Sequence, residues 1–319
     1  MQQNQLKGTN LTVSALCLGT GTFGGRGVYK QSGDVSQKDA NEIVGFALDN
    51  GINLIDTAEI YSSGWSEYML GKALGQRRKE AVIITKVAPE KTDAFPDGEL
   101  SRNRIISGCE ASLKRLGTDY IDIYELHSPS NETPLVETME ALNSLVQTGK
   151  VRYIGCSNFP AWKIVKANNI AKQNGWASFI SLEAKYSLMS RELEYELIPA
   201  CCDEAINVFC FSPLYGGFLS GKYSRNKPWP EGTRFPSRRD TGRWPVDIDK
   251  LFTIVDAMKL IGEHHGVPVS HVALKYLLYK RPISSLNIGT RRISQLKVNI
   301  SATDWEMEAD EIAMLDSIS

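Results

Sequence analysis

The chain has almost no excess charge of either sign. Its 36 Lys and Arg residues nearly balance its 37 Asp and Glu residues, so the formal net charge is −1. Proteins that bind nucleic acids or anionic membranes usually carry clustered basic residues, and no such block interrupts this sequence. We therefore expect a small-molecule partner, with neither nucleic acid nor membrane. Nothing in the sequence indicates an oligomeric state.

Long apolar runs are also missing. None approaches the roughly 18 consecutive apolar residues that a membrane-spanning helix needs. The opening segment, MQQNQLKGTNLTV, contains no basic stretch followed by an apolar core of the secretory type. These absences favour a cytoplasmic protein.

Metal-ligand and redox patterns are absent as well. The six cysteines show no C-x-x-C spacing, and most lie in apolar runs, which favours buried, reduced thiols. Adjacent Cys201 and Cys202 are the one pair that merits a redox test. The four histidines include His264 and His265, which lie on a late helical stretch without an evident set of partners, so we expect them at the surface. No metal site is predicted.

The chain does contain a regular alternation of strand and helix patterns. Apolar, β-branched runs of strand length occur at residues 15–20, 52–58, 82–87, 121–127, 152–158, 179–186, 207–214 and 285–290. Amphipathic segments with helical spacing lie at residues 36–51, 66–76, 101–117, 134–150, 161–175, 192–205 and 268–280. Glycines suited to left-handed helix caps follow four of them: Gly51, Gly117, Gly149 and Gly175. Eight strands alternating with helices predict an α/β fold, a (β/α)8 TIM barrel forming a single domain over residues 1–319.

One long segment breaks this alternation. Residues 223–247 carry four Pro, two Trp and five Arg and show no periodicity, which favours a functional lid over a simple mobile excursion. Its tryptophans, Trp229 and Trp244, either line an apolar substrate site or simply pack. Its arginines either meet an anionic or sugar-like substrate or form a solvated face; the candidates are Arg238, Arg239 and Arg243.

The stretch LGTGTFGG contains a G-x-G-x-x-G pattern at Gly19, Gly21 and Gly24. In a Rossmann site this turn opens directly onto a helix, and an acidic residue about 20 positions later ends a strand. Here helical patterning begins only near Ser36, and the acid at that distance, Glu42, lies within a helix. The pattern therefore does not predict a Rossmann domain.

The Y-x-x-x-K string of short-chain dehydrogenases also occurs twice by spacing alone. The pair Tyr68 and Lys72 follows the glycines too closely for that fold. The pair Tyr276 and Lys280 lies in a late helix. We interpret both as chance.

Catalytic groups of a TIM barrel lie at the carboxyl ends of its strands. Asp56, Lys86 and His127 end three of the apolar runs, and Tyr61 follows Asp56 by five residues. Each alone has an ordinary structural explanation, but together they form a coherent set. A phenol with a pKa of about 10 works as an acid or base near neutral pH only beside a stabilising cation, which Lys86 can supply while Asp56 orients it. His127 can hydrogen-bond a substrate carbonyl.

Over nearly its full length the sequence resembles the aldo-keto reductases. The segments that carry this resemblance are GINLIDTAEIYSSGWSEYMLGKAL, VIITK, SLKRLGTDYIDIYELH, GKVRYIGCSNF, FSPLYGGFLSGKY and IGTRRISQLKVN. It implies a catalytic tetrad of Asp56, Tyr61, Lys86 and His127. It also implies NADPH (NADP+) held at the barrel mouth without a Rossmann domain.

The resemblance assigns cofactor contacts along the chain. Gly21 and Thr22 lie near the nicotinamide ribose, beside Asp56, and the carboxamide meets Ser157, Asn158 and Glu183. The ring and pyrophosphate follow Phe211, Ser212, Pro213 and Leu214. The adenosine 2′-phosphate and adenine take Gly289, Thr290, Arg291, Gln295 and Asn299. An Arg beside a Thr hydroxyl suits a phosphate dianion, which favours NADPH over NADH.

Two positions depart from the family pattern. Where the family commonly has Gln and Tyr, this chain has Glu183 and Phe211. Phe211 keeps a stacking face, whereas Glu183 can only accept hydrogen bonds unless it is protonated. The change alters the charge around Lys86 and the coenzyme ring.

The implied reaction is reduction of an aldehyde or ketone to an alcohol, with hydride from nicotinamide C4, Tyr61 as proton donor and His127 orienting the carbonyl oxygen. We expect Trp65, Tyr61 and His127 to contact the substrate, with walls from loops 88–99 and 128–133 and from the segment 223–247. Two alternatives are a noncatalytic NADPH-binding regulatory subunit, resembling the channel β-subunits of the same superfamily, and a barrel hydrolase with paired carboxylates. The complete tetrad and the lack of an added N-terminal segment oppose the first. The second is opposed because Asp56 is the one acid that ends an expected strand.

Overall fold

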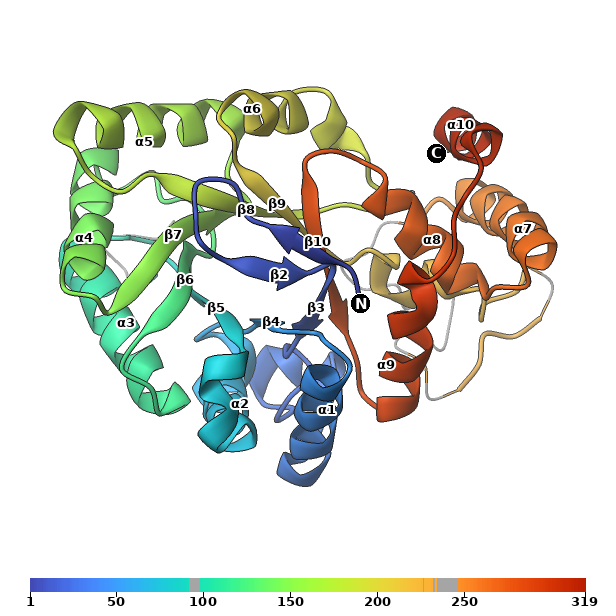
Figure 1. The fold of residues 1–319 in the computed structure, drawn as a ribbon, viewed down its shortest axis with the longest axis horizontal. Coiled ribbons are helices and arrows are strands. Elements are labelled where there is room, and N and C mark those ends of the chain that lie inside the picture. Colours follow the sequence, from blue (N-terminus) through green and yellow to red (C-terminus); the bar gives the residue numbers. More distant parts are fainter. Residues whose placement is uncertain (92–97, 226, 232, 234–245) are drawn as a thin grey trace.

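Eight parallel strands close into a barrel in the computed structural model, which describes residues 1–319 except 92–97, 226, 232 and 234–245 (Figure 1). Around the barrel the order is β10-β3-β4-β5-β6-β7-β8-β9, and β10 pairs with both β3 and β9 to complete the ring. The strands are β3 (Leu16–Gly19), β4 (Leu54–Asp56), β5 (Val82–Val87), β6 (Ile121–Leu126), β7 (Val151–Ser157), β8 (Phe179–Lys185), β9 (Asn207–Phe211) and β10 (Ile283–Gly289). All eight expected strands form, so the predicted TIM barrel is confirmed.

Helices surround the barrel and cover the outer face of its strands (Figure 1). They are α1 (Gln37–Asp49), α2 (Trp65–Leu74), α3 (Arg102–Leu116), α4 (Leu135–Gln147), α5 (Ala161–Asn174), α6 (Leu197–Asp203), α7 (Ile248–His265), α8 (Val269–Leu278), α9 (Ile293–Ile300) and α10 (Ala309–Ile318). The sequence predicted α1 to α6 and α8, and the late helical stretch around His264 and His265 belongs to α7, but α9 and α10 were missed.

The helix expected over residues 192–205 is shorter than predicted. A 3-10 turn covers Glu192–Glu194, and α6 begins only at Leu197. Pro199 explains the break, because proline is tolerated in the first turn of a helix but clashes with the carbonyl four residues earlier.

The helix ends are set locally. Ser36 and Ser101 cap α1 and α3, each accepting a hydrogen bond from a backbone N–H three residues later. The four predicted cap glycines all have positive φ: Gly51, Gly117, Gly149 and Gly175. That prediction is therefore confirmed.

A short antiparallel hairpin of β1 (Gln3–Gln5) and β2 (Thr12–Ser14), which sequence patterning missed, lies across one end of the barrel. Leu6, Leu11 and Val13 pack with Leu54 and other inward-facing strand residues in a separate apolar cluster. The backbone N–H of Lys7 donates to Asn207, the first residue of β9. The hairpin therefore closes the amino-terminal end and leaves the carboxyl end for a site.

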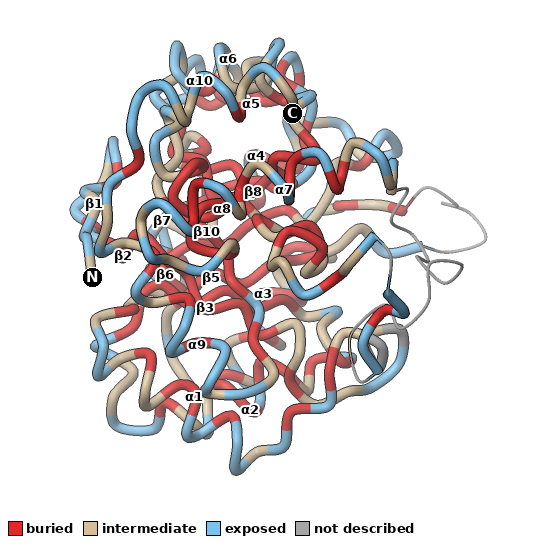
Figure 2. Tube along the Cα trace, turned by 90° about the vertical axis from the view of Figure 1, so that its right-hand side faces the viewer, coloured by how far each residue is buried: buried red, intermediate tan, exposed pale blue. Residues whose placement is uncertain are grey.

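Burial follows the barrel (Figure 2). The strands and the inward faces of the helices form one large apolar core, which the outer helix faces separate from solvent. Among the described residues, no helix is both long and apolar enough to cross a membrane.

Candidate active site

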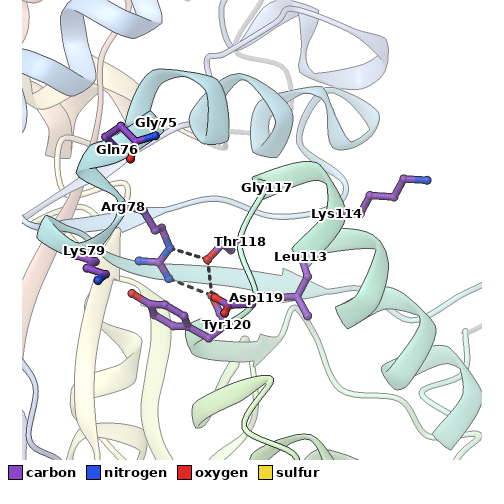
Figure 3. A pocket seen from close by; sticks show the side chains of 10 residues that line it. All are labelled: Gly75, Gln76, Arg78, Lys79, Leu113, Lys114, Gly117, Thr118, Asp119 and Tyr120. Atoms are coloured by element: carbon purple, nitrogen blue, oxygen red, sulfur yellow. Dashed lines mark hydrogen bonds between the residues drawn. The ribbon is translucent and has the colours of Figure 1, made fainter.

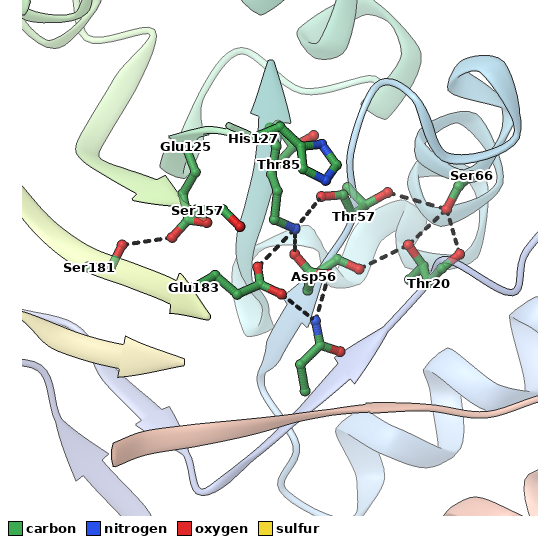
Figure 4. A network of polar contacts seen from close by, with 12 residues as sticks. Thr20, Asp56, Thr57, Ser66, Thr85, Glu125, His127, Ser157, Ser181 and Glu183 are labelled. Atoms are coloured by element: carbon green, nitrogen blue, oxygen red, sulfur yellow. Dashed lines mark hydrogen bonds and ion pairs between the residues drawn. The ribbon is translucent and has the colours of Figure 1, made fainter. Parts of the chain in front are cut away.

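The four residues of the expected tetrad meet at the carboxyl end of the barrel. Figure 4 labels two of them, Asp56 and His127. Asp56 ends β4, Lys86 lies one residue before the end of β5, and His127 directly follows β6. Tyr61 begins a 3-10 turn, Tyr61–Gly64, in the loop after β4. Asp56 and Lys86 are fully buried, whereas Tyr61 and His127 are partly exposed at the rim. Buried charges thus lie beneath two groups that a substrate can reach.

Lys86 is the centre of a buried ionic network. Its ammonium donates to the Asp56 carboxylate and, at 3.1 Å, to the Thr57 carbonyl, and it lies 3.0 Å from Oε2 of Glu183. Burial alone would lower the pKa of Lys86, but the negative charges of Asp56 and Glu183 raise it well above its usual range. Burial raises the pKa of Asp56 to about 7, reinforced by Glu183 and opposed by Lys86. One cation is therefore shared by two carboxylates.

Tyr61 lies over this network. Nζ of Lys86 is 5.3 Å from the centroid of the Tyr61 ring. Burial raises the phenol pKa well above its ordinary value, and Lys86 acts in the opposite direction. Tyr61 therefore keeps its proton at neutral pH in the absence of ligands, which is the state that a proton donor needs.

His127 lies edge-on to Tyr61, with ring centroids 5.7 Å apart. Burial, together with the charge of Lys86, lowers the imidazole pKa to about 3, so the ring is neutral at pH 7. Its Nδ1 atom is buried, and no described residue hydrogen-bonds to it. A buried ring nitrogen without a protein partner suits a ligand that supplies one.

Asn287 is a site residue that sequence reasoning missed. It lies within β10, where its side-chain N–H group donates to Asp56 at 2.7 Å and to Glu183 at 3.0 Å. It fits because Gly19 on the neighbouring strand has no side chain: a Cβ there would come within 2.1 Å of Asn287 Oδ1. The available signal was a polar residue inside the apolar run SLNIGT.

Glu125 is a second buried acid that the sequence did not single out. It lies in β6 and accepts a hydrogen bond from Ser181 Oγ at 2.8 Å (Figure 4). Gly155 makes room for this pair, since a Cβ at that position would meet Ser181 Oγ at 2.1 Å. Burial and the charge of Glu183 raise the pKa of Glu125 well above its usual range.

The residues expected around a nicotinamide carboxamide are neighbours. Ser157 ends β7 opposite Glu183 on β8, and Asn158 has a positive φ of 60°. The Asn158 amide donates to the His127 carbonyl at 3.0 Å and to Ser157 Oγ at 2.9 Å. Glu183 itself points at Lys86 and Asn287. Its carboxylate is therefore already engaged by positive and N–H groups.

The segment expected along the coenzyme ring and pyrophosphate follows β9. Phe211 ends that strand and is partly exposed. Ser212 has a positive φ of 57°, and its carbonyl accepts the backbone N–H of Tyr215 at 2.8 Å, which forms a tight turn. Pro213 is buried and Leu214 is partly buried within this turn. The four residues thus lie together at the barrel rim.

The segment expected to bind the phosphate contacts the loop that follows β3. Gly289 ends β10, Thr290 is buried, and the Thr22 hydroxyl donates to the Thr290 carbonyl at 2.7 Å. Gln295 accepts the backbone N–H of Arg291 at 2.8 Å, and the Arg291 side chain donates to the Ser32 carbonyl at 2.9 Å.

Gly21 and Asn299 complete the predicted coenzyme contacts. Gly21 faces the Tyr61 ring, whose nearest atom would lie 3.7 Å from a Cβ at that position. Asn299 is buried in α9. Gly21 therefore lies beside Tyr61, and Asn299 lies on the helix that follows β10.

On the substrate side, Trp65 begins α2 and is partly buried. The Arg26 guanidinium lies 3.9 Å from the centroid of its ring, and Tyr68 stacks on it at 4.7 Å. Tyr29, which sequence reasoning missed, lies 5.0 Å from the Tyr61 ring. Tyr29 therefore joins His127 as an aromatic neighbour of Tyr61, while Trp65 contacts Arg26 and Tyr68.

Trp229 is the other expected substrate residue whose position the structure describes. Trp229 is buried against Phe218 and Tyr223, so it packs in the core. Trp244, Arg238, Arg239 and Arg243 lie outside the described residues, as does the middle of loop 88–99.

Neither the glycine pattern at residues 19–24 nor the Tyr276 and Lys280 pair forms the cofactor site that its sequence resembles. A 3-10 turn, Gly27–Gln31, follows the glycines before α1 begins, so no helix opens at Gly24 and the rejection of a Rossmann site is confirmed. Tyr276 and Lys280 both donate to Asp316, at 2.5 and 2.6 Å, and thereby join α8 to α10.

A hollow of about 630 Å³ between α2 and α3 lies away from this site (Figure 3). It is lined by the segments 75–79 and 113–120, which precede β5 and β6 and therefore belong to the amino-terminal end of the barrel. Arg78 at its centre is engaged by Thr118 and by the buried Asp122. In TIM barrels this end serves stability, and catalysis belongs to the other.

Two surface expectations are also tested. Among the cysteines, Cys202 is exposed and the other five are buried, as predicted. The surface position expected for the two histidines is confirmed for His264, which is exposed, whereas His265 is only partly exposed. Both contact Glu311 in α10, a partner that the sequence did not reveal. That partner is 46 residues from His265, too far for local patterning to reveal.

Comparisons with known proteins agree with this geometry. The aldo/keto reductase family model matches residues 15–319. An uncharacterised oxidoreductase of Bacillus subtilis is 36% identical over all of this chain and 96% of its own length. An aryl-alcohol dehydrogenase of Pestalotiopsis microspora is 34% identical over 96% of this chain and 79% of its own.

A third relative carries a different kind of name. A probable voltage-gated potassium channel subunit beta of Arabidopsis thaliana is 32% identical over 92% of this chain and 90% of its own length. Both the family model and these relatives span most of the barrel. The chain belongs to the aldo/keto reductase family of oxidoreductases.

Proposed function

We propose that this protein reduces an aldehyde or ketone to an alcohol, with NADPH as reductant and Tyr61 as proton donor. The observation that carries the proposal is the convergence of Tyr61, His127, Lys86 and Asp56 at the open end of the barrel. A protonated phenol, a neutral imidazole and a buried cation within one cluster are the groups that carbonyl reduction needs.

The rim residues suit a nicotinamide coenzyme. Ser157, Asn158 and Glu183 would hold the carboxamide, and Phe211 would stack on the ring while Ser212, Pro213 and Leu214 follow the pyrophosphate. Gly21 and Thr22 would lie at the ribose beside Asp56. The 2′-phosphate and adenine would be held by Gly289, Thr290, Arg291, Gln295 and Asn299. When bound, NADPH supplies the hydride from nicotinamide C4 to the carbonyl carbon.

The protein's own groups act on the substrate oxygen. His127 is neutral and partly exposed beside Tyr61, so a ring N–H group of its imidazole can fix the position of that oxygen. Tyr61 gives its proton to the oxygen as negative charge develops there. Lys86 stabilises the resulting phenolate, and Asp56 and Asn287 keep Lys86 beneath the ring.

We further propose a cytoplasmic location and one barrel domain over residues 1–319. Of the segment 223–247 expected to form a lid, residues 226, 232 and 234–245 lie outside the described residues. Trp65, with Tyr61 and His127, would contact the substrate, and Tyr29 extends the same aromatic wall. A hydrolase with paired carboxylates is not supported, because Asp56 and Glu183 are both tied to Lys86 and Asn287.

The noncatalytic regulatory subunit is the second candidate, since one relative is a probable channel β-subunit. A panel of aromatic aldehydes, dicarbonyls, keto-sugars and steroids, followed by NADPH absorbance, separates the two. We expect turnover of at least one class, with aromatic aldehydes favoured by the aromatic wall. NADPH binding without turnover of any class would support the regulatory subunit, and absence of binding would contradict both candidates.

Replacing Arg291 by Ala tests the coenzyme assignment. We expect KM for NADPH to rise about tenfold or more, because a charge-assisted contact with the 2′-phosphate is lost, and KM for NADH to change little. Steady-state kinetics with both coenzymes measures this. Arg292, exposed and next in the chain, provides the Arg292→Ala control. An equal rise in KM for NADPH and for NADH would show that Arg291 does not bind the 2′-phosphate.

A further inference from the structure

Two histidines and a glutamate from distant parts of the chain converge on one point outside the candidate active site. His264 and His265 form the last turn of α7, and Glu311 lies in the first turn of α10. The two helices pack side by side (Figure 1). His264 Nδ1 lies 3.3 Å from Glu311 Oε1, and His265 Nε2 lies 2.9 Å from both carboxylate oxygens.

These separations resemble those of a metal site. The three ligand atoms all lie within 4.8 Å of one another. Ligands placed tetrahedrally at about 2.0–2.1 Å from a zinc ion are themselves roughly 3.3 Å apart. Small side-chain rotations therefore suffice to place one ion among the two imidazoles and the carboxylate.

The ligands are also held in place by their surroundings. The His265 ring packs against Trp305 with centroids 5.0 Å apart. Glu311 accepts the backbone N–H of Glu308 at 3.0 Å through Oε2, which fixes its carboxylate at the start of α10. Side-chain exposure rises from 12% at Glu311 to 20% at His265 and 62% at His264. One side of the cluster is thus open, which leaves room for a water ligand.

We propose that His264, His265 and Glu311 bind a divalent transition-metal ion such as zinc, with water in the remaining position. Imidazole and carboxylate ligands suit zinc, nickel and copper and do not suit magnesium or calcium, which prefer oxygen alone. Each imidazole contributes a neutral ring nitrogen, and the carboxylate partly neutralises the ion. The bound ion joins α7 to α10 and stabilises the packing of the last helix. It takes no part in the proposed carbonyl reduction.

Zinc titration of the full chain without an affinity tag tests the proposal. Isothermal titration calorimetry gives stoichiometry and affinity, and the melting temperature with and without zinc reports the effect on folding. All proteins carry Cys202→Ser, because Cys202 is the exposed thiol and an alternative ligand. The variants are His264→Ala, His265→Ala and Glu311→Gln. Glu110→Gln is the matched control, because Glu110 is an exposed, ion-paired glutamate outside the cluster.

We expect one zinc per chain, a higher melting temperature with zinc than with magnesium, and affinity lowered about tenfold or more in each of the three variants. The control keeps the parent affinity. His264→Ala is the decisive variant if the others disturb α10, because this exposed side chain contributes least to packing. No saturable zinc binding by the parent, or parent-like affinity in His264→Ala and His265→Ala, would overturn the proposal.

Discussion

Tyr61→Phe is expected to lower kcat for carbonyl reduction about 10²- to 10⁴-fold, the usual contribution of a positioned general acid. The substitution removes one hydroxyl and keeps the ring that packs against His127 and Tyr29. The residues assigned to the coenzyme are untouched, so NADPH affinity should stay within about twofold of the parent. The loss should therefore appear in kcat, because the missing interaction is made as charge develops on the substrate oxygen.

The measurement pairs turnover with coenzyme binding. Steady-state rates give kcat, and quenching of NADPH fluorescence gives the dissociation constant for each protein. Tyr29→Phe is the matched control: it also removes a phenol oxygen beside the site, but Tyr29 is not the proposed donor, so most of the turnover should survive. Full activity in Tyr61→Phe would refute the assignment of Tyr61 as proton donor.

Glu183→Gln should move the pH dependence of the reaction to lower pH by about one unit, since a charge within several ångströms of a buried group changes its ionisation by a kilocalorie per mole or more. Glu183 now shares Lys86 with Asp56. Its negative charge contributes to the raised pKa values of Tyr61 and Asp56. A neutral amide of the same shape leaves more of the positive field of Lys86 acting on Tyr61, so the phenol pKa falls.

The lower phenol pKa moves both pH profiles to lower pH, but it has opposite effects on the rates of the two reaction directions. Alcohol oxidation requires the phenolate, so its rate should begin to rise at lower pH in the variant. Carbonyl reduction requires the phenol, so its rate should begin to fall at lower pH. Profiles of kcat/KM in both directions measure the shift. Glu125→Gln is the control: this buried glutamate is bonded to Ser181 and is not paired with Lys86, so its effect should be smaller. An unchanged profile in Glu183→Gln would show that Glu183 does not set the charge at Tyr61.

The barrel and the tetrad could be predicted from the sequence because the patterns that indicate them extend over only a few neighbouring residues. Strand and helix periodicities depend on neighbouring residues, and Asp56, Lys86 and His127 stand where apolar runs end. In a parallel barrel those ends meet at one rim, so their convergence follows from topology alone. Tyr61 needed only its short distance from Asp56.

The buried polar residues beneath the tetrad could not be predicted in the same way. Asn287 and Glu125 lie inside strands, where a period-two pattern gives no indication of which polar residue faces another across the barrel. The direction of the Glu183 side chain depends on Lys86 and Asn287, which come from strands far apart in sequence. Helix α9 has eight residues and α10 has ten, so each presents few turns for periodicity to reveal, and neither was predicted.

Gly19 and Gly155 have no side chains, and each is therefore coupled in space to a polar residue that is distant in the sequence. Each glycine leaves space that a polar group on the adjacent strand occupies: Asn287 in one case, and Ser181 bonded to Glu125 in the other. A larger residue at either glycine is therefore compatible with the barrel only if the facing polar residue becomes smaller at the same time. The effects of substitutions at the two members of each pair should therefore be non-additive. We expect the buried polar residues at the base of the site to change by coupled substitutions and to resist change at any single position.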